Sequence, residues 1–286
     1  MEIKFVCPYW GQEGTSPSDF FRRILQEGYD GVEINMPESS DFTKEFQIEL
    51  EYARKMDKNF VFIAQQVLPL RQESVKEYAT RLKKRLDTIV ALKPNFINSH
   101  TGKDFFSFDD NCRIIEMVEN IAQQSGIQIL HETHRGRFTF HAASLLPYLE
   151  RFPQLKLTAD FSHWCTVSES LLSDQNEIVE KVIPFVYHLH ARVGYEHSPQ
   201  VNDPFAPEWK STFDTFVGWW KKVIKAGNVT GGFFTICPEF GPVPYMPTMP
   251  FTQKPLGDQW EINVRMKDYL QHEFDWSQNG SSSYAL

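Results

Sequence analysis

Four apolar segments between residues 128 and 239 each end on a carboxylate or an imidazole. They cover residues 128–132, 155–160, 185–190 and 233–239, and they end on Glu132, Asp160, His190 and Glu239. The intervals between these four residues are 28, 30 and 49 positions. A strand with its return helix takes about thirty residues, so each interval holds one such unit and the last also holds a long loop. Since parallel strands end at the same edge, the spacing predicts four polar side chains on one face of a parallel sheet.

The first half of the chain shows the same alternation of short apolar runs and helical periodicity. Strands are predicted at residues 3–9, 31–35, 59–65 and 96–100. Ser16 followed by Pro17 is a typical helix start, and Gly28 is a typical end. Eight strands and eight helices can be counted, which is the inventory of an α/β protein with one (β/α)8 TIM barrel domain. We assign this domain to residues 1–275 and expect residues 276–286 to be a polar, disordered tail.

Composition narrows the classes of protein that the chain can belong to. The net charge of −8 and the pI near 5.6 disfavour a nucleic-acid partner, because phosphate backbones bind basic surfaces. We find no signal peptide, no run long enough for a membrane span and no glycine-rich nucleotide motif. The four cysteines lie far apart, so no disulfide framework is indicated. We therefore expect a cytoplasmic protein with no membrane partner.

Two long segments with several prolines, residues 194–210 and 240–255, follow the last two predicted strands. Loops of this length are uncommon unless they are functional, and both would emerge on the face that holds the four polar side chains. Fixed walls of a site and contacts in a homo-oligomer are both compatible with their composition. The aromatic helix with Trp219 and Trp220 is another candidate for an oligomer contact.

Several short motifs resemble those of a known family. They are Gly31-Val32-Glu33-Ile34 on the second strand, Glu132 on the fifth, Asp160-Phe161-Ser162-His163 after the sixth, His188-Leu189-His190 on the seventh and Glu239 on the eighth. Together they resemble the xylose-isomerase-like TIM barrel superfamily, which holds the sugar phosphate isomerases and epimerases. The resemblance covers residues 1–275 and implies a metal-dependent enzyme of carbohydrate metabolism.

The resemblance implies one divalent metal ion held by Glu132, Asp160, His190 and Glu239. Three carboxylates and one imidazole suit Mn²⁺ or Mg²⁺, with Co²⁺ and Zn²⁺ as alternatives. Alternation along a strand places His188 and His190 on the same face, so either can be the ligand. We favour His190 because it lies nearer the carboxyl end of its strand.

Other roles for these acids are open from the residues alone. Asp160 stands where the N-cap of the next helix would stand. Glu132 and Glu239 follow apolar strand residues and could pair with arginines of neighbouring strands. Glu33 and His100 end the second and fourth strands, and each is expected either to bind a substrate hydroxyl or to stabilise the barrel through hydrogen bonds.

The resemblance also implies a reaction. Family members that isomerise or epimerise move a proton next to a carbonyl, so we expect proton transfer through a metal-bound enediolate on a small sugar, keto-sugar or sugar phosphate. Glu132 and Glu239 would be the base and its conjugate acid. His163 would contact a substrate hydroxyl, and Arg192 would hold a distal oxygen.

Basic residues follow three of the predicted strands, at His134-Arg135-Gly136-Arg137, Lys103 and Arg192. Arginine presents a fork of donors that matches carboxylate and phosphate, so this group hints at an anionic small-molecule carbohydrate. Solvated loop charges, or pairs with nearby acids, explain the same residues nearly as well.

Departures from the family pattern shape the alternatives. After the seventh strand the chain lacks the additional histidine and aspartate motif of the endonuclease IV members, so we do not expect DNA repair. It also lacks the Lys-Asp that follows the seventh-strand histidine in many inosose dehydratases. Two alternatives to an isomerase remain, a metal-dependent lyase of the dehydratase kind and a non-catalytic carbohydrate-binding barrel. The complete set of four ligands argues against the second, because one loss disables such a site.

Overall fold

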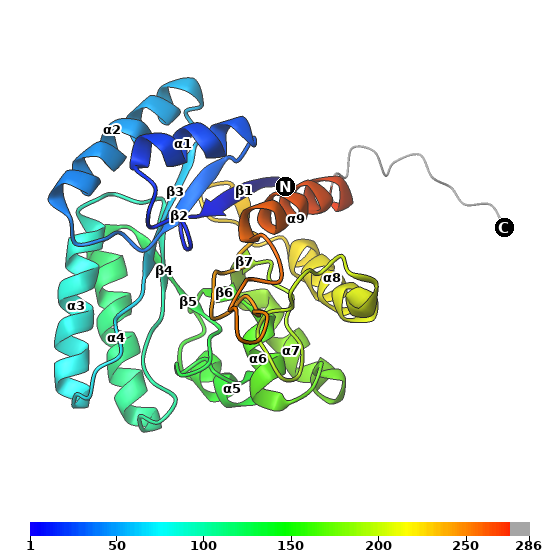
Figure 1. Ribbon diagram of the computed structural model, residues 1–286. Helices are drawn as coiled ribbons and strands as arrows, with labels where there is room; N and C mark the ends of the chain where they lie inside the picture. Colours follow the sequence, from blue (N-terminus) through cyan, green and yellow to red (C-terminus); the bar gives the residue numbers. More distant parts are fainter. Residues whose placement is uncertain (275–286) are drawn as a thin grey trace.

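Eight parallel strands form a closed barrel in the computed structural model, which describes residues 1–274. Each strand pairs with the next along the chain, and β8 pairs with β1. The strands are β1 (Glu2–Pro8), β2 (Gly31–Ile34), β3 (Val61–Gln66), β4 (Phe96–Ser99), β5 (Gln128–Glu132), β6 (Leu157–Ala159), β7 (Val186–His190) and β8 (Phe233–Cys237). Helices surround the barrel (Figure 1), so the expected (β/α)8 architecture is confirmed.

The helical layer holds one more α-helix than the eight expected from the sequence. Among the described residues the α-helices are α1 (Pro17–Gln26), α2 (Ser40–Met56), α3 (Val75–Val90), α4 (Phe108–Ser125), α5 (Ala142–Arg151), α6 (Phe161–Ser168), α7 (Asn176–Val182), α8 (Lys210–Ala226) and α9 (Gln259–Glu273). The connection from β6 to β7 holds two of them, because α6 ends at Glu169 in a left-handed conformation with φ 47°. The tail assigned to residues 276–286 lies outside the described residues.

Helix starts follow local sequence signals. The Ser16 side chain accepts a hydrogen bond from the Asp19 amide, which confirms the start predicted for α1. Ser74 and Glu77 form a reciprocal capping box at the start of α3. Caps of this kind contribute about 1 kcal/mol each, so the return helices are defined largely by nearby residues.

Strand alternation divides the barrel interior into an apolar floor and a polar layer above it. The floor is a separate cluster of buried side chains, Val6, Val61, Ile63, Phe96, Leu130, Phe233 and Cys237. Two residues further along β3, β4 and β5 stand Gln65, Asn98 and Glu132, which are also buried. Buried polar groups need hydrogen-bond partners, so we expect the side chains of this layer to form an interconnected network at the carboxyl ends of the strands.

Both tryptophans of α8 lie inside the protein. Trp219 and Trp220 are only 4% and 0% exposed and belong to the hydrophobic core, so these two side chains do not form a surface for an oligomer contact. Their helix turns both rings inward, where Trp219 packs against Phe161 with ring centroids 5.4 Å apart. No helix among residues 1–274 is both long and apolar enough for a membrane span.

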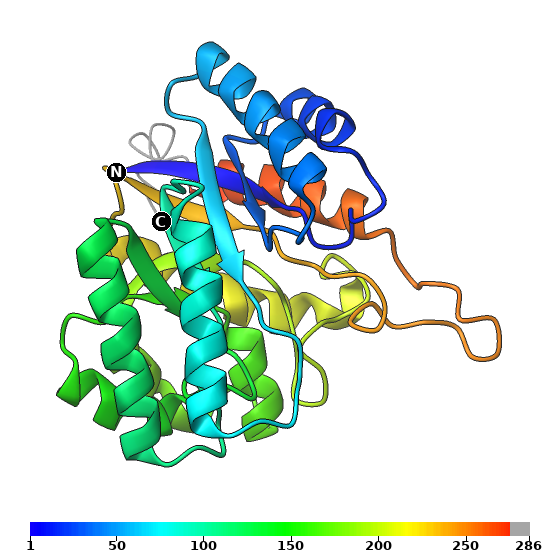
Figure 2. The same ribbon diagram turned by 90° about the vertical axis from the view of Figure 1, so that its left-hand side faces the viewer.

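The segment after β8 extends away from the barrel and returns to α9, as the orange trace in Figure 2 shows. Phe251 on this segment is fully exposed, whereas Tyr245 lines the central cavity. Gly241 lies so close to the Trp10 indole that an added Cβ would stand 2.1 Å from the ring. Only glycine permits this approach, so Trp10 and the base of the segment form one wall of the site.

Candidate metal centre and active site

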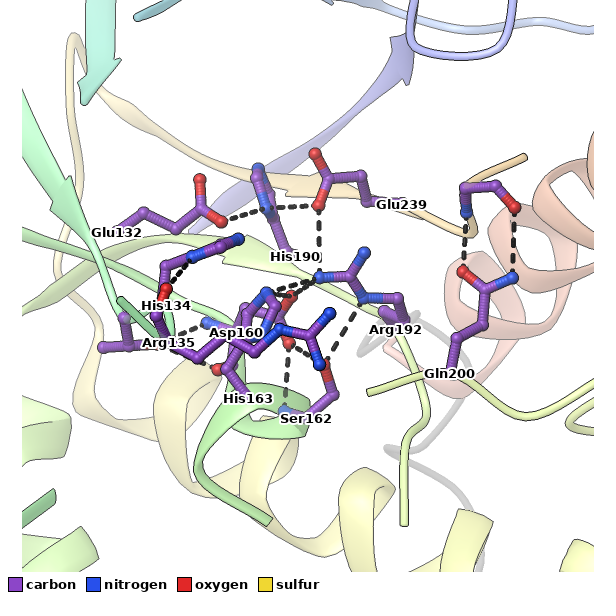
Figure 3. A network of polar contacts seen from close by, with 12 residues as sticks. Glu132, His134, Arg135, Asp160, Ser162, His163, His190, Arg192, Gln200 and Glu239 are labelled. Atoms are coloured by element: carbon purple, nitrogen blue, oxygen red, sulfur yellow. Dashed lines mark hydrogen bonds and ion pairs between the residues drawn. The ribbon is translucent and has the colours of Figure 1, made fainter. Parts of the chain in front are cut away.

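The four side chains expected to hold a metal ion meet at the carboxyl ends of β5 to β8. One potential ligand atom from each of Glu132, Asp160, His190 and Glu239 lies within 4.8 Å of the others. All four side chains are buried, and Glu239 is the most exposed at 4%. His190 lies between the two glutamates in Figure 3.

The two nitrogens of His190 have different surroundings. Nε2 lies 3.1 Å from both carboxylate oxygens of Glu33, so this nitrogen carries a proton and donates a hydrogen bond to that carboxylate. Nδ1 points into the cluster, 2.8 Å from Glu239 Oε2 and 3.8 Å from Glu132 Oε1. It is buried and makes no hydrogen bond. A ring nitrogen and carboxylate oxygens that converge on one point are the arrangement of ligands around a cation, and a bound cation would take the place of the proton on Nδ1.

His188 lies deeper in the barrel than His190. Its Nε2 is 3.0 Å from Glu33 Oε2, and its Nδ1 is 2.6 Å from Thr235 Oγ1. Its ring packs on Phe96 of the apolar floor, with ring centroids 5.4 Å apart. Both ring nitrogens therefore have protein partners, and the imidazole that faces Glu132 and Glu239 is the one of His190.

Asp160 caps a helix as well as joining the cluster. Its Oδ1 accepts hydrogen bonds from the Ser162 amide at 2.9 Å and the Ser162 hydroxyl at 2.5 Å, at the start of α6. Its Oδ2 forms an ion pair with the Arg192 guanidinium, which also lies 3.8 Å from Glu239 Oε2. The cap and the ion pair fix the carboxylate in position, while a carboxylate oxygen retains further lone pairs.

Two amides in the network were not anticipated from the sequence. Asn98 Nδ2 donates to Glu33 Oε1 at 2.9 Å and to Glu132 Oε2 at 2.8 Å. Gln65 Nε2 donates to Glu239 Oε1 at 3.2 Å. Strand alternation indicates that Asn98 shares a face with His100, because it stands two residues before it. The partners of Asn98, Glu33 and Glu132, come from two other strands, and no local pattern indicates them.

The cluster holds an excess of buried negative charge. Four carboxylates surround two basic side chains, the guanidinium of Arg192 and the imidazole of His190; the carboxylates are those of Glu33, Glu132, Asp160 and Glu239. Burial raises the pKa of Glu239. Burial also disfavours the charged form of His190, but the Glu239 and Glu33 carboxylates outweigh it and hold the pKa of His190 well above its ordinary value. A divalent cation would neutralise this excess, so the donor set fits the metal that the motifs implied.

A cavity of about 720 Å³ opens above the cluster. Its lining includes Glu132, Glu239, His100, His134, Arg137, Arg192, Tyr9, Trp10, Phe42 and Tyr245. Of the four residues expected to bind substrate, His100 and Arg192 line this cavity. Glu33 lies beneath His190, and His163 lies behind His134, with ring centroids 3.8 Å apart. The lining therefore combines carboxylates, imidazoles, guanidiniums and aromatic rings.

Three histidine rings stack along one side of this cavity. His100 Nε2 lies 2.9 Å from Glu132 Oε2, and the His134 ring lies between those of His100 and His163. His163 Nε2 accepts a hydrogen bond from Arg192 at 2.9 Å. Burial, together with nearby histidines, holds the pKa values of His134 and His163 well below their ordinary range. His134 is therefore neutral at neutral pH, not one of the cations inferred from the sequence.

Comparison with known proteins supports the fold. No family model matches the chain, and no curated protein matches it. Among solved structures, the 3-keto-D-glucoside 4-epimerase YcjR from E. coli has a TM-score of 0.61 and 13% identity over 95% of this chain and 100% of its own. A xylose isomerase-like TIM barrel protein from Mycobacterium smegmatis, in complex with magnesium, has a TM-score of 0.61 and 12% identity over 94% and 95%.

A third similar structure is named for a different activity. It is the probable 3-DHS dehydratase AsbF from Bacillus anthracis, with a TM-score of 0.55 and 16% identity over 93% of this chain and 99% of its own. At such identities the likeness concerns the fold. The chain is thus structurally similar to xylose isomerase-like TIM barrel proteins.

Proposed function

We propose that the chain is an enzyme that binds one divalent metal ion and isomerises or epimerises a small sugar, keto-sugar or sugar phosphate. The observation that carries the proposal is the orientation of His190, whose Nε2 donates to Glu33 while Nδ1 faces Glu239 and Glu132 without a hydrogen bond. Asp160 would complete the set of ligands. Three of the four ligands are carboxylates, and this oxygen-rich set favours Mn²⁺ or Mg²⁺. The bound ion would act as a Lewis acid that stabilises negative charge on a substrate oxygen.

Glu132 and Glu239 are the proposed proton carriers. They come from β5 and from the residues just after β8, which two other strands separate in the barrel, and both line the cavity. Carboxylates that reach a substrate from different sides can act as base and conjugate acid on a carbon next to a carbonyl. Return of the proton to the opposite face of the same carbon gives an epimer, and return to the neighbouring carbon gives an isomer.

Other residues of the chain would position these carriers and shield the reaction. Asn98 and His100 both contact Glu132 Oε2, at 2.8 and 2.9 Å, and so restrict the carboxylate to one orientation. Trp10 and Tyr245 pack edge to face over the cavity, with ring centroids 4.9 Å apart. Aromatic walls of this kind can cover the apolar side of a sugar and exclude water.

Two measurements test this function. The purified protein should hold about one divalent ion per chain, and Glu239→Gln should weaken its binding by about 10–100-fold. Incubation of the metal-loaded protein with candidate sugars in D₂O should place one deuterium on a carbon of the recovered isomer or epimer. Unchanged metal content and thermal stability, both after chelation and in Glu239→Gln, would contradict the proposed metal centre.

A metal-dependent lyase is the second candidate, and one observation favours it. His134 is a neutral imidazole that lines the cavity, and His100 lies between it and Glu132, with the two histidine rings 4.3 Å apart. It supplies a base in addition to the two glutamates, which elimination of a β-hydroxyl can use. The similarity to a probable 3-DHS dehydratase agrees with this candidate. Loss of one water from the product, measured by mass, would identify the lyase, whereas deuterium in a product of unchanged formula would identify the isomerase.

A further inference from the structure

Arg137 is a buried cation without a counter-ion among residues 1–274. It lies in the segment after β5, is 7% exposed and lines the cavity. Its Nε is buried without a hydrogen-bond partner. Nη2 lies 3.4 Å from His100 Nδ1, and Nη1 lies 3.5 Å from the Gly136 carbonyl, both at the long end of hydrogen-bond distances.

Other arginines of the same protein show how unusual this is. Arg192 is also buried but forms an ion pair with Asp160, and the partly buried Arg81 forms one with Glu73. No carboxylate of the described part of the chain forms an ion pair with Arg137. Burial of a guanidinium without an anion costs free energy, and its forked donors match a carboxylate or a phosphate.

A second cation reinforces the positive potential at this end of the cavity. Lys103 is 6% exposed, its ammonium stands 5.5 Å from the centre of the Tyr78 ring, and no acid within residues 1–274 forms an ion pair with it. Burial and the charge of Arg137 both lower the pKa of Lys103. Two neighbouring cations that form no ion pair within residues 1–274 make a region in which an anionic group of a ligand would be favoured.

We propose that Arg137 binds an oxyanion of the substrate, a carboxylate or a phosphate, at the β4–β5 side of the cavity. Only the His100 ring separates this guanidinium from the Glu132 carboxylate, with contacts of 3.4 Å on one side and 2.9 Å on the other. The anionic group therefore lies within a few bonds of the carbon that Glu132 would deprotonate, which selects compact sugar acids or short sugar phosphates. The assignment of this anion to a substrate rests on the proposed function, whereas the binding of an anion by Arg137 does not depend on it.

Anion binding to the metal-free, full-length protein tests this directly. Inorganic phosphate and acetate are titrated by calorimetry into the wild type, Arg137→Gln, Arg137→Lys and Arg135→Gln, with chloride as the ionic-strength control. Arg135 is on the same segment and does not belong to the lining, so it is the matched control. We expect Arg137→Gln to lose about 10–100-fold in affinity, Arg137→Lys to retain part of it, and Arg135→Gln to stay within about twofold. Tighter binding of phosphate indicates a sugar phosphate, and tighter binding of acetate a sugar acid.

Thermal stability and metal content separate the possible failures. Removal of an unpaired buried cation should leave the melting temperature of Arg137→Gln equal or higher, so a variant that unfolds would overturn the inference. Absence of anion binding, or equal losses in the Arg135 and Arg137 variants, would also overturn it. If the wild type binds Mn²⁺ but no anion, the anion site is wrong and the proposed metal centre stands. If anion binding depends on Arg137 but no metal binds, the proposed metal centre is wrong and the anion site stands.

Discussion

His190 and Glu33 share a hydrogen bond deep in the barrel, with Nε2 of the imidazole 3.1 Å from both oxygens of the carboxylate. The contact orients the ring and turns Nδ1 toward the acids at the barrel mouth. Asn98 connects the same carboxylate to Glu132, at 2.9 and 2.8 Å. The polar layer is thus a single network in which residues below the centre orient those that face the cavity.

Glu33→Gln should weaken metal binding although Glu33 does not face the cavity. Replacement of the carboxylate by an amide removes the charged acceptor that orients His190, and loss of such partners typically costs about 10–100-fold in metal affinity. Titration of metal-free protein with Mn²⁺ measures the change. Glu116→Gln, on the half-exposed side chain of α4, is the control and should bind as the wild type does. Equal affinities of the two variants would show that Glu33 does not position the ligand.

Substitution of each histidine of β7 distinguishes their roles. His190→Gln should abolish stoichiometric metal binding, because Nδ1 is the nitrogen that faces Glu239 and Glu132. His188→Gln should retain one ion per chain, since both nitrogens of His188 already have partners, Glu33 and Thr235. Metal analysis after gel filtration gives the stoichiometry. The opposite pattern would assign the ligand to His188.

Arg192→Gln should destabilise the metal-free protein strongly. The guanidinium is 2% exposed and is the only charged partner of the Asp160 carboxylate among residues 1–274, because the nearby His163 has a lowered pKa and is neutral. Removal of one partner of a buried ion pair costs about 3–5 kcal/mol. Urea denaturation measures the loss, and added Mn²⁺ should restore part of it by neutralising the acids.

The control for this variant is Arg265→Gln. Arg265 pairs with Asp203 at 3.2 Å on the surface and is half-exposed. Exposed pairs contribute about 0–1 kcal/mol, so this variant should resemble the wild type. A loss below about 1 kcal/mol in Arg192→Gln would mean that the buried pair does not hold the acids in place.

The two buried neutral histidines predict a stability that falls on the acid side. His134 and His163 have lowered pKa values, so below about pH 6.5 the unfolded chain takes up protons that the folded protein does not. The free energy of unfolding of metal-free protein should therefore fall between pH 6.5 and about 5, by up to about 1.4 kcal/mol per pH unit for each histidine. Above this window neither residue contributes to the slope.

Urea denaturation at several pH values tests the sign and the size of this slope. His190 has a raised pKa, so it is protonated in both states below pH 6.5 and adds no slope in the same window. His163→Gln should lower the slope by about one proton. An unchanged slope in that variant would show that the charge of His163 does not differ between the folded and unfolded states.

Much of the architecture follows from local signals. Strand ends at Glu132 and His190 were placed correctly because apolar runs and their spacing are visible along the chain, and the start of α1 at Ser16 follows from its cap. The presence of two helices, α6 and α7, between β6 and β7 was harder to predict, because the left-handed turn at Glu169 that ends α6 has no glycine to mark it. Burial of Trp219 and Trp220 likewise depends on how α8 is rotated against the barrel.

The sequence by itself determined a (β/α)8 barrel and the strand ends at which Glu132, Asp160 and Glu239 stand, because periodicity and spacing are local properties of the chain. Tertiary structure decided what each side chain faces. Glu33 and His190 are separated by 157 positions, and their contact directs Nδ1 of the histidine toward the acids. Arg137 after β5 and Arg192 after β7 are the same residue type, yet only Arg192 forms an ion pair with an acid among residues 1–274. Such pairings arise when the barrel closes and brings distant strands together, so no local pattern encodes them.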